Sequence, residues 1–258
     1  MFGPAPNVQA IAAVNPANVF ATVAFLGIAA FWGETVLGSF PLTAAAKLLQ
    51  TITLAWAVRA WSETSVGPSR EYARLLSAGL AFSILGDFFV MFGTVVPHGA
   101  RDPSLLLRPR LLAAGVLAFT LTQVFYTRAM RRVGSVPSRV ALAGVPAAFA
   151  ILAFASHWTL RMPLPLAAGS ALYALFLGVT VAHASAGLRN EDLPVPARRA
   201  AALGAWLFAI TDGLLPVVIF GPGAGLDVPR LGLWTYQAYI VSQCFFALSA
   251  FWLRSTEE

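Results

Sequence analysis

Apolar stretches long enough to cross a lipid bilayer follow one another along this chain, separated by short polar segments. A helix needs roughly 20 predominantly apolar residues to cross the hydrocarbon core. The composition agrees, because 58% of the residues are hydrophobic and only 11% are charged, whereas a soluble domain carries about 25% charged residues. The sequence therefore predicts an all-α, polytopic membrane protein.

Eight such segments can be delimited, and prolines, which suit the first turn of a helix, stand near the start of five of them. The segments cover residues 18–35, 41–60, 72–93, 110–130, 138–156, 163–185, 198–220 and 231–253. We therefore divide the chain into an N-terminal tail (1–17), an eight-helix transmembrane domain (18–253) and a C-terminal tail (254–258). The longest connection, residues 93–109, is the one large enough to form a lid or an interfacial segment.

The arginines indicate how the helices are oriented. Eight spans place both termini on one side of the membrane. With the N-terminus inside, eleven arginines fall in or beside the inner loops and five in or beside the outer ones. The positive-inside rule favours this arrangement. We therefore expect a multi-pass protein of the bacterial inner (cell) membrane with both termini cytoplasmic.

Several classes of function find no support in the sequence. The net charge of +6 comes from arginines at helix ends and not from a basic, aromatic-rich tract, so no nucleic-acid partner is expected. The single cysteine excludes an intrachain disulfide. Metal-ligand spacing, phosphate-binding loops, dinucleotide fingerprints and the Gly-x-Ser-x-Gly elbow are absent. We therefore predict no metal and no cofactor, and the oligomeric state stays open.

Two carboxylates interrupt the apolar segments: Asp87 in the third and Asp212 in the seventh. A charged carboxylate at the centre of a span costs roughly 2.5–3.5 kcal/mol even on insertion scales, so it marks a functional site by default. Both aspartates are expected at similar depth on helices that run in the same direction. If they share a pocket, repulsion and desolvation favour one protonated acid beside one ionised base. The alternative is a structural role, in which each carboxylate pairs with a cation or caps a neighbouring helix.

Other polar side chains are predicted at matching depths and suggest one buried pocket. Lys47 lies in the second segment, Glu34 closes the first, and Gln123, Tyr239 and Gln243 lie near the middle of the fourth and eighth. Lys47 and the two glutamines also have structural alternatives. Lys47 could be the ion partner of an aspartate, and the two glutamines could be ordinary interhelical hydrogen-bonding residues.

The tyrosines divide in the same way. Tyr126 and Tyr239 are candidates for lining the pocket or for packing, and Tyr236 is interpreted as a packing or interfacial aromatic.

The two halves of the chain also resemble each other. The third and fourth segments carry an aspartate and then a glutamine, Asp87 and Gln123, and the seventh and eighth carry Asp212 and Gln243 in the same order. This pattern suggests a parallel repeat of four plus four helices with a pocket near its pseudo-axis. Lys47 has no counterpart in the sixth segment.

Four motifs together resemble the YhhN-like lysoplasmalogenase family. They are FSILGD at 82–87, GVLAFTLTQVFY at 115–126, GAWLFAITD at 204–212 and YIVSQ at 239–243. Their order and spacing match over the second to eighth segments.

The chain departs from the family pattern at three positions. Leu48 follows Lys47 where the family often has proline, Gln123 stands where histidine is common, and Thr211 stands where serine is frequent. The histidine difference puts a proton-transfer role for position 123 in doubt.

The resemblance implies an eight-helix membrane enzyme that needs no cofactor. It would hydrolyse the vinyl ether bond of a lysolipid taken from the bilayer, a lysoplasmalogen, and release a fatty aldehyde and a glycerophospho-alcohol. Asp87 and Asp212 would form the acid–base pair. The apolar Phe88 and Phe89 beside Asp87 favour that residue as the acid.

The remaining candidates would bind the substrate. Lys47 would set the charge of one aspartate or meet the phosphate, and Glu34, Gln123, Tyr126, Tyr239 and Gln243 would line the pocket. Two other functions remain open from the residues alone: a small-solute or proton-coupled transporter, and a lysolipid-binding protein without catalysis.

Overall fold

The computed structural model describes residues 14–95, 107–226, 228 and 230–254, and this part of the chain is helical without any strand. Its elements are α1 (Pro16–Thr35), α2 (Phe40–Thr64), α3 (Gly67–Val95), α4 (Leu107–Arg132), α5 (Arg139–Leu160), α6 (Leu164–Gly187), α7 (Val195–Phe220), a short 3₁₀ turn η3 (Pro222–Ala224) and α8 (Leu231–Arg254). Each predicted segment coincides with one of the α-helices. The all-α prediction is therefore confirmed for the described residues. The predicted tails, for the most part, and most of the proposed lid in the 93–109 connection lie outside them.

The helices extend past the apolar segments at the end of the bundle where the charged residues gather. The α2 helix continues to Thr64 and α3 already begins at Gly67, so both include polar residues that the apolar pattern does not count. There Glu63 forms ion pairs with Arg59 at 2.7 Å, with Arg70 at 3.8 Å and with Arg74 at 3.9 Å. Exposed pairs of this kind contribute little stability each, but they mark this end as the polar one.

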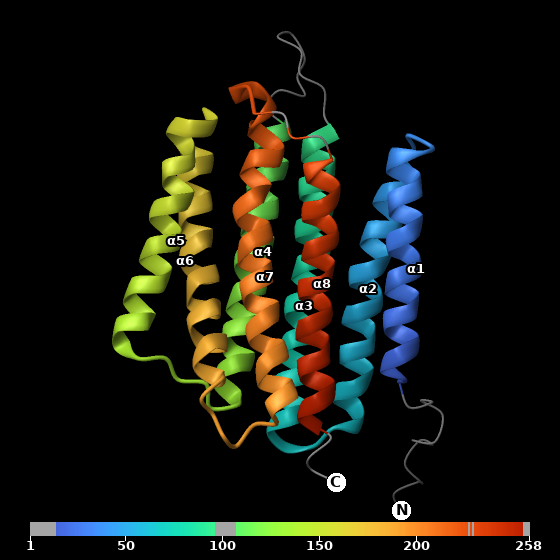
Figure 1. Cartoon of the computed structure of the whole chain (residues 1–258), viewed down its shortest axis with the longest axis vertical. Coiled ribbons are helices and arrows are strands. Elements are labelled where there is room, and N and C mark those ends of the chain that lie inside the picture. The colour runs from blue at the N-terminus through green and yellow to red at the C-terminus, as the bar shows by residue number, and fades with distance from the viewer. Residues whose placement is uncertain (1–13, 96–106, 227, 229, 255–258) are drawn as a thin grey trace, which may run out of the picture.

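The helices run alternately up and down, so α1 begins and α8 ends at the same end of the bundle (Figure 1). In Figure 1, α3, α4, α7 and α8 form the middle of the bundle, with α1 and α2 on one flank and α5 and α6 on the other. The α2 helix packs against α3 and α8, and α6 packs against α4 and α7. The two flanks thus meet the central helices in the same pattern.

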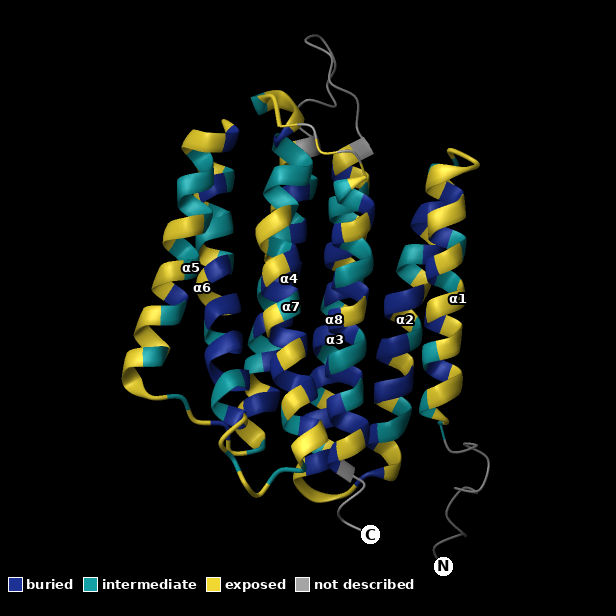
Figure 2. Ribbon diagram, viewed as in Figure 1, coloured by how far each residue is buried: buried dark blue, intermediate teal, exposed yellow. Residues whose placement is uncertain are grey.

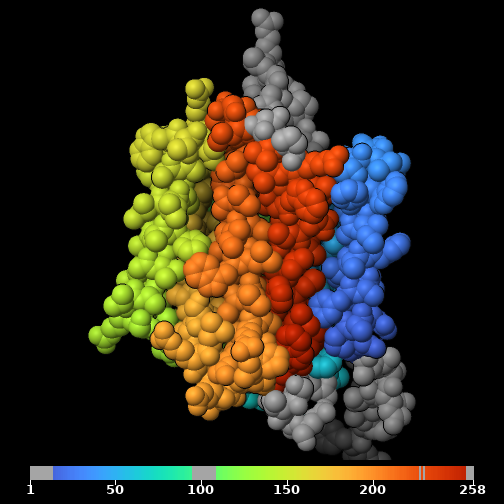
Figure 3. Space-filling model, in the orientation of Figure 1, coloured from blue at the N-terminus to red at the C-terminus, as the bar shows by residue number. Residues whose placement is uncertain are grey.

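Buried side chains face the centre, and large apolar side chains cover the outside. Tyr126, Phe208 and Phe246 are almost completely buried between the central helices, whereas Val140 is 83% and Leu152 is 71% exposed on α5. Figure 2 shows this division along each helix, and Figure 3 shows one continuous outer face formed by α7 and α8 between α5 and α1. Large apolar side chains are thus exposed on many of the described helices, as expected of a surface that faces lipid.

Six of the described helices are long and apolar enough to cross a membrane: α1, α3, α4, α5, α6 and α7. This supports a membrane protein. The other two, α2 and α8, fall short because they carry many of the polar side chains, among them Lys47, Gln50, Gln237 and Gln243. These are the helices on which several of the candidate site residues lie.

Close approach of α5 and α6 depends on a glycine that faces a proline. A Cβ added at Gly178 would lie 2.5 Å from the Cα of Pro146 and 2.9 Å from its nitrogen. Because both atoms belong to the backbone, the neighbouring helix would have to move. Small residues at such crossings allow helices in membranes to pack tightly.

We predict that Gly178→Ala destabilises the protein. Overpacking of this kind typically costs about 1–3 kcal/mol, which exceeds the roughly 1 kcal/mol that alanine gains over glycine in a helix. The matched control is Gly144→Ala on α5, where a Cβ would meet nothing within 4 Å. Thermal unfolding in detergent should show a lower midpoint for Gly178→Ala and an unchanged or higher one for Gly144→Ala. Equal midpoints for both variants would contradict the packing described above.

Candidate active site

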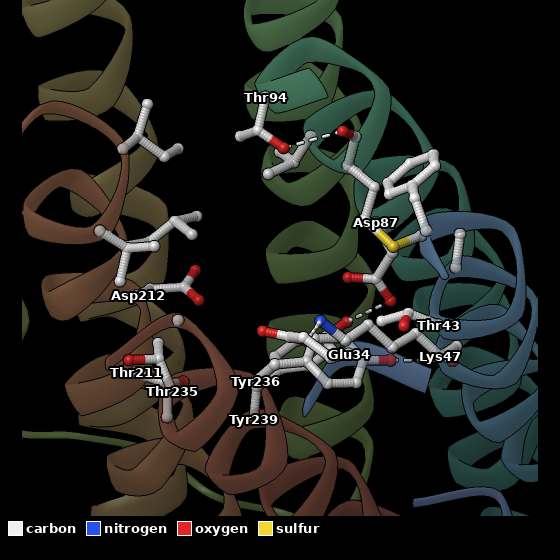
Figure 4. A pocket seen from close by; sticks show the side chains of 18 of the residues that line it. Glu34, Thr43, Lys47, Asp87, Thr94, Thr211, Asp212, Thr235, Tyr236 and Tyr239 are labelled. Carbon is white, nitrogen blue, oxygen red and sulfur yellow. Dashed lines mark hydrogen bonds and ion pairs between the residues drawn. The ribbon is translucent and has the colours of Figure 1, made fainter. Parts of the chain in front are cut away.

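A cavity of about 500 Å³ lies near one end of the bundle, among α2, α3, α7 and α8. It extends from Tyr239 to the turn between α1 and α2 at Gly38 and Ser39. Five of the predicted site residues line it, namely Glu34, Lys47, Asp87, Asp212 and Tyr239. Figure 4 shows Asp87 and Asp212 projecting into the space from opposite walls.

Asp87 is buried on α3 and receives two hydrogen bonds on the same oxygen. The hydroxyl of Thr51 on α2 donates to Oδ2 at 3.1 Å, and that of Tyr239 on α8 donates at 3.2 Å. The preceding residue is Gly86, where a Cβ would lie 2.7 Å from the ring of Phe119. The missing side chain therefore lets the ring of Phe119 of α4 pack against α3 at Gly86, where it forms part of the cavity wall.

Asp212 is half-buried on α7, and its hydrogen-bond donor comes from α6 and not from α2 or α8. The hydroxyl of Tyr173 on α6 donates a hydrogen bond to its Oδ2. Nε2 of Gln123 on α4 lies 3.4 Å from the same tyrosine oxygen, so a chain of three side chains ends at the carboxylate. In addition, Pro216 stands inside α7 and has no N–H to donate to the backbone carbonyl four residues earlier, which is that of Asp212.

Lys47 forms its ion pair with Glu34 and not with an aspartate. Its Nζ lies 3.0 Å from Oε2 of Glu34, and it also lies 4.7 Å from the centre of the Tyr236 ring, within range of a cation–π contact. The Tyr236 hydroxyl donates to the backbone oxygen of Lys47 at 2.8 Å. The interpretation of Lys47 as the ion partner of an aspartate is therefore wrong for this structure. Tyr236, assigned to packing from the sequence, lines the cavity instead.

The other three predicted binding residues stand behind the cavity. Of the described residues, Gln123, Tyr126 and Gln243 do not line the cavity. Tyr126 donates to Oε1 of Gln243 at 2.5 Å, and Nε2 of Gln243 donates to Ser83 at 3.4 Å. Gln123 reaches an aspartate only through Tyr173. Gln123 therefore supports Asp212 indirectly, whereas Tyr126 and Gln243 form hydrogen bonds behind the cavity.

Three residues that contact the site were not singled out from the sequence in this role: Thr51, Tyr173 and Tyr236. Thr51 follows Lys47 by four residues, so both lie on the same face of the helix. This spacing could have predicted Thr51 as a residue of the site. Tyr173 bonds a carboxylate 39 residues away on another helix, and no spacing rule points to it.

The buried polar atoms without a hydrogen-bond partner in the part of the chain that the structure describes include Oγ1 of Thr235, which lines the cavity, and Oε1 of Gln123. Such atoms are costly unless something satisfies them, so Thr235 is available to a ligand. Across the same described residues, no three His, Cys, Asp or Glu side chains come together to form a group that could hold a metal ion.

The arrangement offers two carboxylates facing one space, a lysine–glutamate pair and several hydroxyls. It can donate and accept protons at two points and bind charges of both signs.

Comparison with known proteins identifies the family. No curated protein and no solved structure matches this chain. The model of the YhhN family matches residues 42–250, which include both aspartates and all four motifs. The resemblance drawn from those motifs is confirmed, and the chain belongs to the YhhN family.

Proposed function

We propose that the protein is a membrane hydrolase that cleaves the vinyl ether bond of lysoplasmalogen-like lysolipids, with Asp87 and Asp212 as its acid–base pair. The observation that carries this proposal is the projection of both carboxylates into one cavity from opposite walls. Membership of the YhhN family supports it, because the match spans both residues.

The chemistry needs two carboxylates in different protonation states. A protonated aspartate gives its proton to the β-carbon of the vinyl ether, which leaves an oxocarbenium-like cation at the α-carbon and ether oxygen. The ionised aspartate stabilises this cation and takes a proton from water as the water adds to the α-carbon. The resulting hemiacetal breaks its bond between the α-carbon and the glycerol oxygen. The aspartate that took the proton from water gives it to the leaving glycerol oxygen, and the other aspartate takes the proton of the hemiacetal hydroxyl, so both carboxyl groups return to their starting states. The products are a fatty aldehyde and a glycerophospho-alcohol. Paired carboxylates serve glycoside hydrolysis in a comparable way.

The charged residues of the cavity suit a zwitterionic headgroup. Lys47 and Glu34 offer one charge of each sign close together, as do the phosphate and the amine of a phosphoethanolamine or phosphocholine group. The Tyr236 ring already lies against a cation, and Thr235 has a free hydroxyl among the described contacts. Lys47 would therefore meet the phosphate, while Glu34 and Tyr236 would meet the amine.

We further propose that all eight helices span the inner membrane of a bacterium, with both termini cytoplasmic and the cavity in the outer half. Arginines at the end of the bundle where α1 begins and α8 ends support this orientation by the positive-inside rule: Arg59, Arg70, Arg74 and Arg132. The matching pattern of flank packing supports a repeat of four plus four helices.

The central prediction is that Asp87→Asn and Asp212→Asn each abolish aldehyde release. Loss of a positioned acid or base typically costs about 10²–10⁴-fold, and asparagine keeps the size and an acceptor oxygen of the side chain. The control is Asp192→Asn, because Asp192 is exposed between α6 and α7 at the far end of the bundle. Aldehyde is measured by mass spectrometry on protein purified in detergent, with elution and thermal stability as checks on folding.

The same assay includes the saturated ether analogue and water labelled with ¹⁸O. The glycerophospho-alcohol should stay unlabelled, because the glycerol oxygen is the leaving group, and the analogue should remain intact. Near-normal turnover by either asparagine variant would rule out the paired mechanism. If the unaltered protein releases no aldehyde, solute flux in proteoliposomes and lysolipid binding decide between a transporter and a binding protein.

We also predict that Lys47→Met weakens substrate binding without impairing the chemical step. A hydrogen bond to a charged group contributes about 1.5–3 kcal/mol, so KM should rise roughly tenfold to hundredfold, with kcat changed little. An alkenyl glycerol without phosphate serves as the control substrate and should be cleaved equally by both proteins. An equal loss on this neutral substrate would contradict phosphate recognition by Lys47.

A further inference from the structure

A second cavity, of about 340 Å³, lies among α4, α5, α6 and α7, beside the one that holds both carboxylates. Apart from Ser156, Ser170, Tyr173 and Asp212, its lining carries no polar side chain. Its volume is at the lower end of the roughly 300–1,000 Å³ of small-ligand sites.

The two cavities meet along a shared wall. Val90, Phe119, Asp212, Leu215 and Ile219 line both of them. Among these shared residues Asp212 is the single ionisable one. On one side of it lie the lysine–glutamate pair and Asp87, and on the other side lie mainly apolar side chains from α5 and α6.

We infer that this second cavity holds the hydrocarbon chain of the substrate. The inference rests on the proposed function and specifies its substrate: an amphiphile with one unbranched chain, whose charged head occupies the cavity of Lys47 and Glu34. Burial of a hydrocarbon chain gains about 0.8 kcal/mol of free energy for each methylene removed from water. A lysolipid that leaves the bilayer keeps this free energy only if the protein offers its chain an apolar compartment.

The scissile bond of such a lipid lies where its polar and apolar parts join, and the shared wall is the corresponding place in the protein. The β-carbon of the vinyl ether begins the hydrocarbon side, so it would lie next to Asp212. The α-carbon and the ether oxygen would lie towards Asp87. Asp212 is then the acid that protonates the β-carbon, and Asp87 orients the water.

This assignment is the opposite of the prediction from the sequence, in which Phe88 and Phe89 favoured Asp87 as the acid. Oδ2 of Asp87 accepts hydrogen bonds from both Thr51 and Tyr239, as expected of a carboxylate that acts as an acceptor. Asp212 accepts one, from Tyr173.

The second cavity also reaches the outer surface of the bundle. Leu152 of α5 lines the cavity and is 71% exposed. A chain can therefore enter from the bilayer at the side of the protein. The modest volume suits one chain, so diacyl phospholipids, which carry two, are expected to be excluded.

Gly213 provides a direct test. It lines the second cavity and not the first, and a Cβ at this position would meet nothing within 4 Å. Gly213→Leu should therefore fill the chain compartment without moving the backbone. The matched control is Gly144→Leu, which adds the same side chain at an exposed position of α5 with equally open space. Because Gly213 adjoins Asp212, Ala153→Phe on α5 fills the same cavity from another helix.

The assay uses lysoplasmalogens that share one headgroup and differ in the length of the alkenyl chain. Each displaced methylene costs about fourfold in kcat/KM, so Gly213→Leu and Ala153→Phe should lose roughly tenfold to hundredfold on the longest chain. The shortest chain should be cleaved nearly as well as by the unaltered protein, and Gly144→Leu should behave normally throughout. The inference is overturned if both filling variants treat all chain lengths alike.

A second measurement does not depend on turnover. A saturated ether lysolipid with a diazirine at the end of its chain is photo-crosslinked to the unaltered protein, and the labelled peptides are identified. Labels on α5 and α6 support the chain compartment, even if no aldehyde forms and the proposed hydrolase fails. Labels on α1 or α2, together with normal aldehyde release, overturn the inference and leave the hydrolase standing.

Discussion

The buried carboxylate of Asp87 is the constraint on which the rest of the site depends. A charge or polar group removed from water needs hydrogen-bond partners, and Asp87 obtains them from Thr51 on α2 and Tyr239 on α8. These two bonds tie three helices together around one oxygen. They also fix where Lys47, four residues before Thr51, and Tyr236, three residues before Tyr239, can lie. The polar half of the cavity follows from this arrangement.

Asp212 is supported in a different way, through a chain of neutral groups. Gln123 contacts the oxygen of Tyr173, which donates to the carboxylate. The amide can fix the orientation of the tyrosine hydroxyl but cannot exchange a proton as a histidine can. Under the proposed mechanism, position 123 therefore positions another side chain and takes no part in proton transfer. The glutamine found there is compatible with catalysis by the two aspartates.

The sequence predicted the features that arise from local patterns. Apolar length located the eight α-helices of the described residues, and the cost of a carboxylate in hydrocarbon singled out Asp87 and Asp212. The pairings between helices could not be derived in this way, because they depend on how helices rotate about their axes. Lys47 thus pairs with Glu34 and not with an aspartate, and Tyr173 reaches Asp212 without any sequence spacing that signals it. Gln243 and Tyr126 form a hydrogen bond with each other behind the cavity, although the depth predicted for Gln243 matched that of the carboxylates.

Under the proposed function, the junction of the two cavities at Asp212 would determine where each product goes. Cutting an amphiphile at its polar–apolar boundary yields one water-soluble fragment and one that prefers lipid. The first would leave from the cavity that ends at the turn between α1 and α2, and the second would leave past Leu152 into the bilayer. Each fragment then partitions into a different phase as soon as it departs. Dilution into two separate media would oppose recombination and draw the reaction forward without an energy source.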